Sequence, residues 1–450
     1  MLPPLNSRNG VFLNLDIYLY SGVPYGVMFL ERHLPLFFNG EQPVLWAPLA
    51  DQGWRPCLAS VNAPSFPQKS EGYLQVFLDG GLNQQRMGIC DAVAISKMLN
   101  ATLVIPHLEV NPVWQDSSSF MDIFDVDLFI NVLKNDISII KELPEEFSWS
   151  TREYYGTAIR ATRVKRAPVH ASANWYLENV LPLLQSYGIA AISPFSHRMT
   201  FDDLVGEIQQ LRCKVNFKAL VFVPHTRALG DALVHRLRYP KGQSQAISTD
   251  YLRETTDPND EQKPQKFVEL HLRFDKDMAA HSACDFGGGK SEKLALAKYR
   301  QTIWQGRELW VSTIIPIFIL HPTRYMEGKL ELFPLMEDKK SLASSEERVR
   351  IKGKASLLAA VDYYVGMHSD IFISASPGNM HNALVGHRSF ENMKTIRPNM
   401  GLVGPLLLNK NITWSEFRQA VVEGHQKRHG QLRLRKPKHT YPAPDCMCHA

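Results

Sequence analysis

The stretch YLQVFLDGGLNQQRMG at residues 73–88 decides the fold class, because an apolar run ends there in a glycine turn. A short apolar run bounded by turn residues predicts a buried strand, and the apolar spacing of residues 84–100 predicts a helix after it. The segment FVELHLRFDKD at residues 267–277 restarts the pattern in the second half of the chain. These paired α/β units predict a protein of two domains with a cleft between them. Ligands bind beyond the carboxyl ends of such strands.

Length and composition favour a folded protein with more than one domain. The chain has 450 residues, of which 44% are hydrophobic and 21% charged. A chain of this size exceeds a single ordinary core, and this composition is typical of globular rather than disordered proteins. The net charge of +5 suits an anionic ligand, but it lacks the concentrated basic face that nucleic-acid binding requires. We therefore expect no nucleic-acid partner.

The pattern of turns and composition divides the chain into four parts. Residues 1–70 are rich in proline and show little periodicity, so we predict an irregular N-terminal region. Residues 71–240 are predicted to form the first domain, and residues 241–266, rich in polar and turn-forming residues, a linker. Residues 267–450 are predicted to form the second domain, which ends in a basic, solvated tail. Within these domains the apolar patterns also predict strands at 102–106, 188–194, 219–224 and 371–375, a helix that follows 219–224 and ends near 237, and a helix over 348–367.

The cysteines and the N-glycosylation sequons leave the cellular location open. The six cysteines permit disulfides without indicating their pairing, and their spacing predicts no metal site. Two sequons begin at Asn100 and Asn411, and they matter only in a lumenal protein. No secretory signal is legible, and no run of about 18 apolar residues is long enough to span a membrane.

The loop after the first strand is a candidate for binding an anion. Gly80 and Gly81 allow the backbone to approach a ligand closely, and the amino end of the following helix attracts negative charge. The alternative is a plain strand–helix turn. The loop lacks the G-x-G-x-x-G spacing of dinucleotide-binding proteins, so an NAD-dependent oxidoreductase is disfavoured.

Two further strand ends carry candidate ligand-binding residues. His271 and Arg273 alternate onto one side of their strand, where Arg273 is suited either to grip a diphosphate or to pair with Asp275 or Asp277. In the segment 374–380, Gly378, Asn379 and Met380 begin a helix that either binds an anion or is capped by Ser376 or Asn379. Arg388, further along that helix, is expected either to contact a phosphate or to be solvated. No catalytic triad, P-loop or zinc motif is present.

Four long segments resemble the plant O-fucosyltransferase family, in the correct order. They are FLDGGLNQQRMGICDAVAISKMLNATLVIPHLEVNPVWQDSSSFMDIFDVD at 77–127, LRCKVNFKAL at 211–220, HLRFDKDMAAHSACDF at 271–286 and SDIFISASPGNMHNALVGHR at 369–388. The resemblance runs from about residue 40 to the C-terminus, and ordered motifs of this length are far more specific than a single short motif.

The resemblance implies a GT-B glycosyltransferase with two Rossmann-like domains that face across a cleft. The first domain would lie on the acceptor side, and the second would bind a nucleotide sugar. The implied reaction is an inverting, metal-independent transfer of fucose from GDP-fucose to a glycan or protein acceptor. Related enzymes use UDP-rhamnose in pectin synthesis, and the motifs leave that alternative open. The family also carries a membrane anchor and resides in the Golgi, although no anchor is visible in this sequence.

The resemblance also implies roles for individual residues. Arg273 would contact the donor diphosphate, Asn83 would lie near the reacting sugar, and Asp277 is the acidic residue that follows the arginine. Asp362 would recognise the nucleotide base, and the phosphate would be held by Gly378, Asn379, Met380 and Arg388. The general base stays open among His271, Asp79 and Asp277.

One region departs from the family pattern. Residues 308–331 are shorter than the corresponding family segment, which includes a strand of the donor domain, and the run at 314–320 is the candidate replacement strand. A shortened donor domain predicts weakened donor binding. A catalytically impaired relative with a binding or regulatory role is therefore a further alternative.

Overall fold

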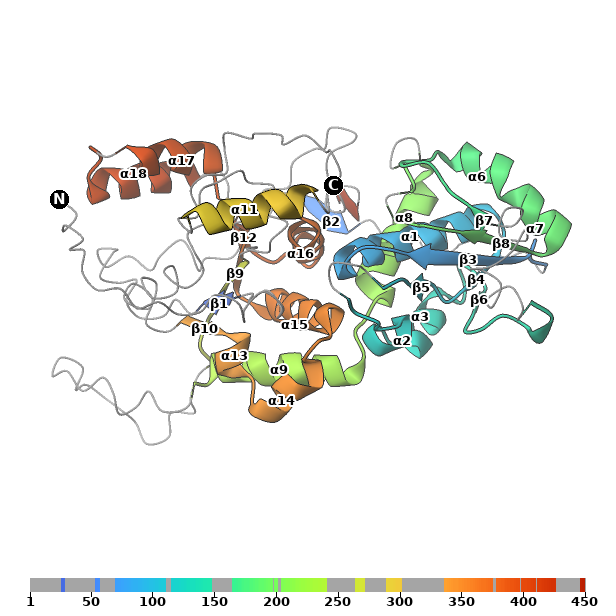
Figure 1. Ribbon diagram of the computed structural model, residues 1–450, viewed down its shortest axis with the longest axis horizontal. Helices are drawn as coiled ribbons and strands as arrows, with labels where there is room; N and C mark the ends of the chain where they lie inside the picture. The colour runs from blue at the N-terminus through green and yellow to red at the C-terminus, as the bar shows by residue number, and fades with distance from the viewer. Residues whose placement is uncertain are drawn as a thin grey trace.

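The computed structural model describes fourteen segments of the chain, and all structural statements below concern them. They are residues 26–28, 53–56, 69–110, 115–147, 164–196, 198–200, 204–240, 264–271, 289–301, 336–374, 378–396, 398–409, 411–425 and 446–449. Two α/β units lie side by side (Figure 1), so the predicted α/β class with two sheet-centred units is confirmed.

The first unit is built on a parallel sheet whose central strand is β3 (Tyr73–Leu78). The strand order is β6-β4-β3-β8-β7, and these strands are β4 (Thr102–Val104), β6 (Ile139–Ile140), β7 (Val164–Lys165) and β8 (Ile189–Ile192). A short strand, β5 (His107–Leu108), pairs with the carboxyl end of β3. The predicted strands at 73–78, 102–106 and 188–194 are therefore present.

Helices pack around the sheet of the first unit. The 17-residue helix α1 (Leu82–Met98) follows β3 and is buried along nearly its whole length. The other helices are α2 (Phe120–Ile123), α3 (Val126–Leu133), α6 (Ala173–Asn179), α7 (Leu181–Tyr187) and α8 (Gly206–Lys214), with a 3-10 turn η3 (Glu145–Phe147) and a π-helical turn η4 (Val215–Ala219). The strand expected near residues 219–224 is absent from this described segment, since η4 and a single bridge residue at Phe222 take its place.

The second unit is built on a mixed sheet with the strand order β10-β1-β9-β11-β12. Its strands are β1 (Gly26–Met28), β9 (Val268–His271), β10 (Met336–Asp338), β11 (Ile371–Ser374) and β12 (Thr395–Ile396). Strands β9, β11 and β12 are parallel, whereas β1 runs antiparallel to both of its neighbours. A separate ribbon joins β2 (Trp54–Pro56) to β13 (Met447–His449). The predicted irregular region 1–70 thus contributes two short strands.

The helices of the second unit surround this sheet. They are α9 (Pro224–Arg238), α11 (Gly289–Tyr299), α13 (Lys339–Leu342), α14 (Ser345–Ile351), α15 (Ala355–His368), α16 (Asn379–Phe390), α17 (Met400–Leu408) and α18 (Trp414–His425). The single helix expected over 348–367 is two helices, because Gly353 adopts a φ of +78° between α14 and α15. Positive φ is a conformation that glycine adopts without strain.

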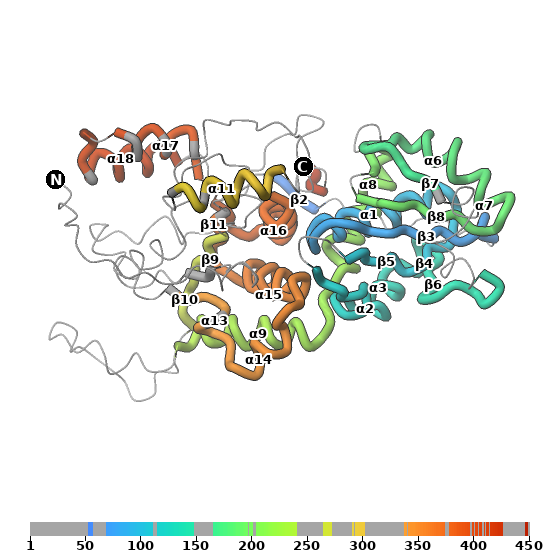
Figure 2. Tube along the Cα trace, viewed as in Figure 1, coloured from blue at the N-terminus to red at the C-terminus, as the bar shows by residue number. Residues whose placement is uncertain are grey.

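Helix α9, which lies within the predicted first domain of residues 71–240, packs on the second unit. Leu233 and Leu237 of α9 form a cluster with Phe267 of β9 and with Val361 and Val365 of α15. The chain therefore crosses between the units before α9, and the trace in Figure 2 shows this helix beneath α15. Local periodicity identified the helix but carries no information about which sheet it covers.

The two units share one continuous hydrophobic core. Helix α1 packs against α15 and α16, and the largest cluster of buried residues includes Leu357 and Leu384 of the second unit together with Leu74 and Ile89 of the first. Among the helices that the structure describes, none is long and apolar enough to cross a membrane. The linker at 241–263 and the segment 308–331 lie outside the described residues.

Candidate functional site

The loop after β3 aims the amino end of α1 at the second unit. Ser196 donates a hydrogen bond from Oγ to the carbonyl oxygen of Asp79, 2.7 Å away, and so holds the start of the loop. Gly80 has a φ of +91°, and a Cβ there would lie 2.4 Å from the side chain of Gln84. Gly81 caps α1, and its carbonyl accepts a hydrogen bond from the amide of Gln84 at 2.9 Å. The turn therefore requires glycine at position 80.

A second helix amino end begins at Gly378. Its φ of +149° lies in the region that favours glycine, and α16 starts at the next residue, Asn379. The N-cap residue is Gly378, which has no side chain, and Asn379 is the first residue inside the helix, so the capping expected from Asn379 is not observed. Ser376 lies outside the described residues. The amino end of a helix carries partial positive charge, which attracts anions.

The structure brings these two helix ends together. Asn83 of α1 donates a hydrogen bond from Nδ2 to Sδ of Met380 on α16, at 3.2 Å and across 297 residues of sequence. Asn83 is buried, and within the described part of the chain its Oδ1 has no hydrogen-bond partner. Two predicted site residues from different units therefore meet, with the amino ends of α1 and α16 beside them.

His271 lies at the carboxyl end of β9, in the sheet of the second unit. It is buried and pairs in register with Ser374 of β11, and its ring lies 6.4 Å from that of Phe372. The predicted residues Arg273, Asp275 and Asp277 fall outside the described residues, so their placement is untested.

Asp362 is enclosed in a buried cluster of charged residues. Its Oδ2 accepts a hydrogen bond from Nζ of Lys339 at 2.6 Å. Burial raises the pKa of Asp362, against the lowering effect of the Lys339 ammonium. Glu269 of β9 belongs to the same cluster, and burial, followed by the nearby Asp362, raises its pKa well above the ordinary range. The role of Asp362 in recognising a base stays a prediction.

Sequence reasoning missed Glu269, although its position carried a signal. It is an acidic residue in the middle of the apolar strand VELH, where strand alternation places it on the buried face. Its Oε2 has no hydrogen-bond partner among the described residues, and a Cβ at Gly366 would lie 2.4 Å from that atom. Such surroundings disfavour the charged form of a carboxyl group.

Arg388 is completely buried, so the expectation that it is solvated is wrong. Its three guanidinium nitrogens donate hydrogen bonds to backbone and hydroxyl oxygens of Gly366, Ser369, Asp370, Lys394 and Thr395. Burial lowers the pKa of Arg388 to about 10. These hydrogen bonds tie α16 to the segments that flank β11 and β12, and the predicted contact of Arg388 with a phosphate stays a prediction.

Arg86 lies between the units, one turn of α1 beyond Asn83. Its guanidinium carbon lies 4.6 Å from the ring centroid of Tyr363, and it also stacks on the rings of Phe124 and Phe222. Nη2 donates a hydrogen bond to the carbonyl oxygen of Asn216 at 2.8 Å. Sequence reasoning missed this residue because its partners come from three distant segments.

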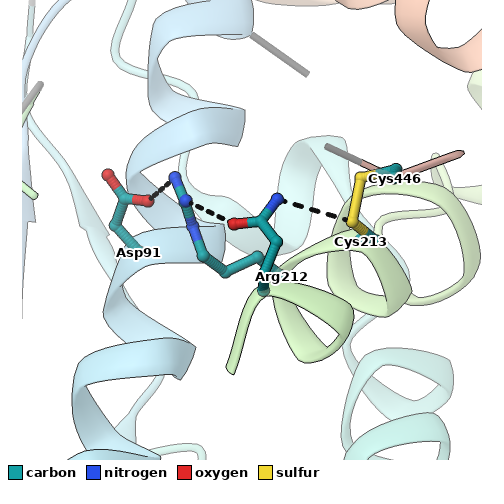
Figure 3. Close-up of a disulfide and its surroundings, with 5 residues drawn as sticks. Asp91, Arg212, Cys213 and Cys446 are labelled. Carbon is teal, nitrogen blue, oxygen red and sulfur yellow. Dashed lines mark hydrogen bonds and ion pairs between the residues drawn. A yellow bond between two sulfur atoms is a disulfide. The ribbon is translucent and has the colours of Figure 1, made fainter. Parts of the chain in front are cut away.

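A disulfide fastens the C-terminal segment to the first unit. Cys213 of α8 is bonded to Cys446, at a sequence separation of 233 residues, and Cys448 is also disulfide-bonded. Beside it, Arg212 and Asp91 form a fully buried ion pair at 2.5 Å (Figure 3). In the described segments, no group of three or more His, Cys, Asp and Glu residues is arranged to hold a metal ion.

The two sequons differ in accessibility. Asn100 has a φ of +48°, and its Nδ2 donates a hydrogen bond to the carbonyl oxygen of Lys69 at 2.8 Å. Asn411 is exposed at the start of α18, where Thr413 and Glu416 form the helix cap.

Comparison with known proteins identifies relatives over most of the chain. The family model described as GDP-fucose protein O-fucosyltransferase matches residues 73–391. O-fucosyltransferase 39 of Arabidopsis thaliana is 65% identical, over 93% of this chain and 92% of the relative. O-fucosyltransferase 31 of the same plant is 60% identical, over 91% of this chain and 86% of the relative.

Solved structures give a weaker likeness. A crystal structure of POFUT1 in complex with GDP aligns with a TM-score of 0.35 and 12% identity, over 72% of this chain and 96% of the other. The family assignment rests on the sequence comparisons.

Proposed function

The chain belongs to the O-fucosyltransferase family of glycosyltransferases, and on that basis we propose that it transfers fucose from GDP-fucose to an acceptor hydroxyl. The acceptor is a glycan or a protein, and the transfer proceeds with inversion and without a metal ion. The acceptor oxygen forms a bond to the anomeric carbon while the bond from that carbon to the diphosphate breaks. Negative charge then grows on the departing GDP, where fixed positive charge accelerates the reaction most.

The contact between Asn83 and Met380 is the observation that carries this proposal. It places the amino ends of α1 and α16 next to each other, and each end favours an anion such as a diphosphate. Gly378 and Asn379 lie at the same place, and the unpartnered Oδ1 of Asn83 can accept a hydrogen bond from a sugar hydroxyl. A site built from both units suits a reaction between two substrates.

We assign the remaining roles by family resemblance. Arg273 neutralises the departing diphosphate, Asp277 follows it in the same motif, and Asp362 recognises the base. The general base is one of His271, Asp79 and Asp277. Of these, His271 lies at the end of β9, and Asp79 precedes the loop that carries Asn83.

Two alternatives keep the same site. In the first, the donor is UDP-rhamnose, because a diphosphate site formed by helix ends does not distinguish between the two bases. In the second, the chain binds a nucleotide sugar without turning it over and acts as a binding or regulatory protein.

The disulfides support a lumenal location. Cys213–Cys446 is a bond between distant segments, and disulfides persist in oxidising compartments such as the secretory pathway. We propose that the protein works in the lumen of the Golgi, where its family is expected to act.

Calorimetric titration with GDP-fucose, GDP, UDP-rhamnose and UDP tests the proposal. We expect saturable binding of GDP-fucose and GDP, and a loss of binding in Arg273→Ala. In turnover assays this variant should lose about 2–4 kcal/mol of transition-state stabilisation, as expected when a charge-stabilising donor is removed. Binding of UDP-rhamnose alone would establish the first alternative, and no nucleotide binding by folded protein would refute the donor site.

Asn83→Ala, with Asn131→Ala on the surface of α3 as the matched control, tests the contact itself. We expect Asn83→Ala to weaken GDP-fucose binding and the control to leave it unchanged. Unchanged binding in Asn83→Ala would exclude the meeting point of α1 and α16 as the donor site.

A further inference from the structure

A pocket separate from the meeting point of α1 and α16 opens in the first unit. Its volume is about 510 Å³. Ligand sites occupy about 300–1,000 Å³, so this pocket has the size of one. It lies beside β3, at the carboxyl ends of β4, β5 and β6 and against α2, elements that gather in one part of this unit (Figure 1). The carboxyl edge of a parallel sheet is the usual place for a ligand.

Both aromatic rings and polar groups line this pocket. Phe77 is buried and its ring lies 5.4 Å from that of His107 at an angle of 57°. Burial lowers the pKa of His107, so its imidazole is neutral at pH 7 and both donates and accepts hydrogen bonds. Ser117 adds a hydroxyl group to the lining. A pyranose ring presents C–H groups on its faces and hydroxyls around its edge, which match this pairing of ring faces and hydrogen-bonding groups.

The mouth of the pocket carries exposed apolar side chains. Val110 is 56% exposed and Met121 is 50% exposed, and both line the pocket. Large apolar side chains that gather at a concave, polar-rimmed site commonly mark a surface that a ligand covers.

The charges of the lining balance. Among the lining residues, Lys141 and Glu142 are the ionised side chains, and they have opposite signs. Lys141 is also paired with Asp127 at 2.7 Å. A diphosphate or a chain of uronic acids would require an excess of positive charge, so a neutral ligand fits this pocket better.

The pocket adjoins the contact between the two units. Asp116 precedes Ser117, which lines the pocket. Its carboxylate accepts a hydrogen bond at 2.5 Å from the backbone amide of Ser356, which lies at the start of α15. Burial raises the pKa of Asp116, but hydrogen bonds from Ser356 and Ser118 outweigh this effect and hold the pKa below its ordinary value. The wall of the pocket is therefore fixed to the second unit, which carries Asn379 and Met380.

From this geometry we propose that the pocket binds a neutral sugar residue of an oligosaccharide acceptor. The assignment of this ligand as the acceptor rests on the proposed function, since a transferase needs a second substrate. Binding of the sugar in the pocket does not depend on the donor, so this proposal and the proposed function can fail separately. Phe77 and His107 hold the sugar ring, and Met121 and Val110 cover its outer side.

Saturation-transfer NMR on the full chain tests the proposal with three probes. They are a neutral galacto-oligosaccharide, a galacturonan oligosaccharide of the same length, and a serine- and threonine-rich peptide. We expect saturable binding of the neutral oligosaccharide, weakened about tenfold in His107→Ala and in Met121→Glu. Leu177→Glu is the matched control for Met121→Glu, because Leu177 is 40% exposed on α6, outside the pocket lining, and it should leave binding unchanged.

The outcomes separate the pocket from the donor site. Binding of the peptide alone or of the galacturonan alone, or unchanged affinity in both pocket variants, would overturn the proposal. No binding of the neutral oligosaccharide to folded protein would overturn it as well. Oligosaccharide binding without any nucleotide binding would support the pocket and refute the donor site, and GDP affinity should be the same in all three variants.

Discussion

The guanidinium of Arg86 lies 4.6 Å from the ring of Tyr363, so a cation of the first unit is stacked on an aromatic residue of the second. Phe124 and Phe222 cover other sides of the same cation, which is 1% exposed. Because Arg86 is one turn from Asn83, this packing fixes the amino end of α1 relative to α15 and α16. It links the shared core of the two units to the geometry of the proposed donor site.

We predict that Arg86→Met destabilises the protein by about 2–4 kcal/mol, since it removes a desolvated cation–π contact and leaves the Asn216 carbonyl without its donor. Urea unfolding followed by tryptophan fluorescence measures the loss. Arg350→Met, at an exposed position of α14, is the matched control and should change stability by less than about 0.5 kcal/mol. Equal effects of the two substitutions would contradict the role of Arg86.

His387 should make stability depend on pH. Its Nδ1 lies 2.9 Å from the Tyr363 hydroxyl, and burial, followed by the Arg86 cation, lowers the pKa of His387 well below its ordinary value. The unfolded chain takes up a proton near pH 6.5 while the folded chain does not, so the free energy of unfolding falls as pH decreases below that value. The contribution is at most about 1.4 kcal/mol per pH unit.

Urea unfolding of wild type and His387→Gln between pH 8 and pH 5 checks this dependence. The variant should show a shallower decrease below about pH 6.5, because the group that titrates on unfolding is gone. His225→Gln, an exposed position of α9, controls for the loss of a surface histidine. Parallel pH profiles for wild type and His387→Gln would show that the ring is protonated in the folded protein.

Local patterns in the sequence predict much of the fold but little of its tertiary arrangement. Strands β3, β9 and β11 were evident because buried strands are short apolar runs that end in turn residues. The sequence does not indicate where α9 packs or that β1 is inserted next to β9, because both features depend on contacts between distant segments. Helix periodicity shows that α9 has an apolar face and says nothing about its partner.

The residues of the candidate site likewise divide into those that the sequence predicts and those that it does not. Gly378 was identifiable from local chemistry, as a glycine at a strand–helix junction, and Asn83 was identifiable from the family resemblance. The burial of Arg388 was not identifiable from the sequence, since its hydrogen-bond acceptors are carbonyl oxygens whose positions follow from packing. The pocket next to Phe77 and His107 gave no signal in the sequence, because it forms where four strands and a helix meet.

The Cys213–Cys446 disulfide should stabilise the protein by about 2–5 kcal/mol, because it closes a long loop of the unfolded chain. Cys213→Ala and Cys446→Ala should each show this loss in urea unfolding without reductant. The double variant should lose little more than either single one, since both remove the same bond. Additive losses would contradict the bond, and Cys90→Ala, at another buried cysteine, controls for the removal of a buried sulfur.

Glycosylation should distinguish the two sequons if the chain enters the secretory pathway. Nδ2 of the asparagine carries the glycan, and in the folded protein that atom of Asn100 is engaged with the Lys69 carbonyl, whereas Asn411 is exposed. We therefore expect glycosidase treatment of protein from a secretory host to increase gel mobility in wild type and in Asn100→Gln. Asn411→Gln should show no change. A shift that survives in Asn411→Gln and disappears in Asn100→Gln would mean that the Asn100 hydrogen bond does not protect its side chain.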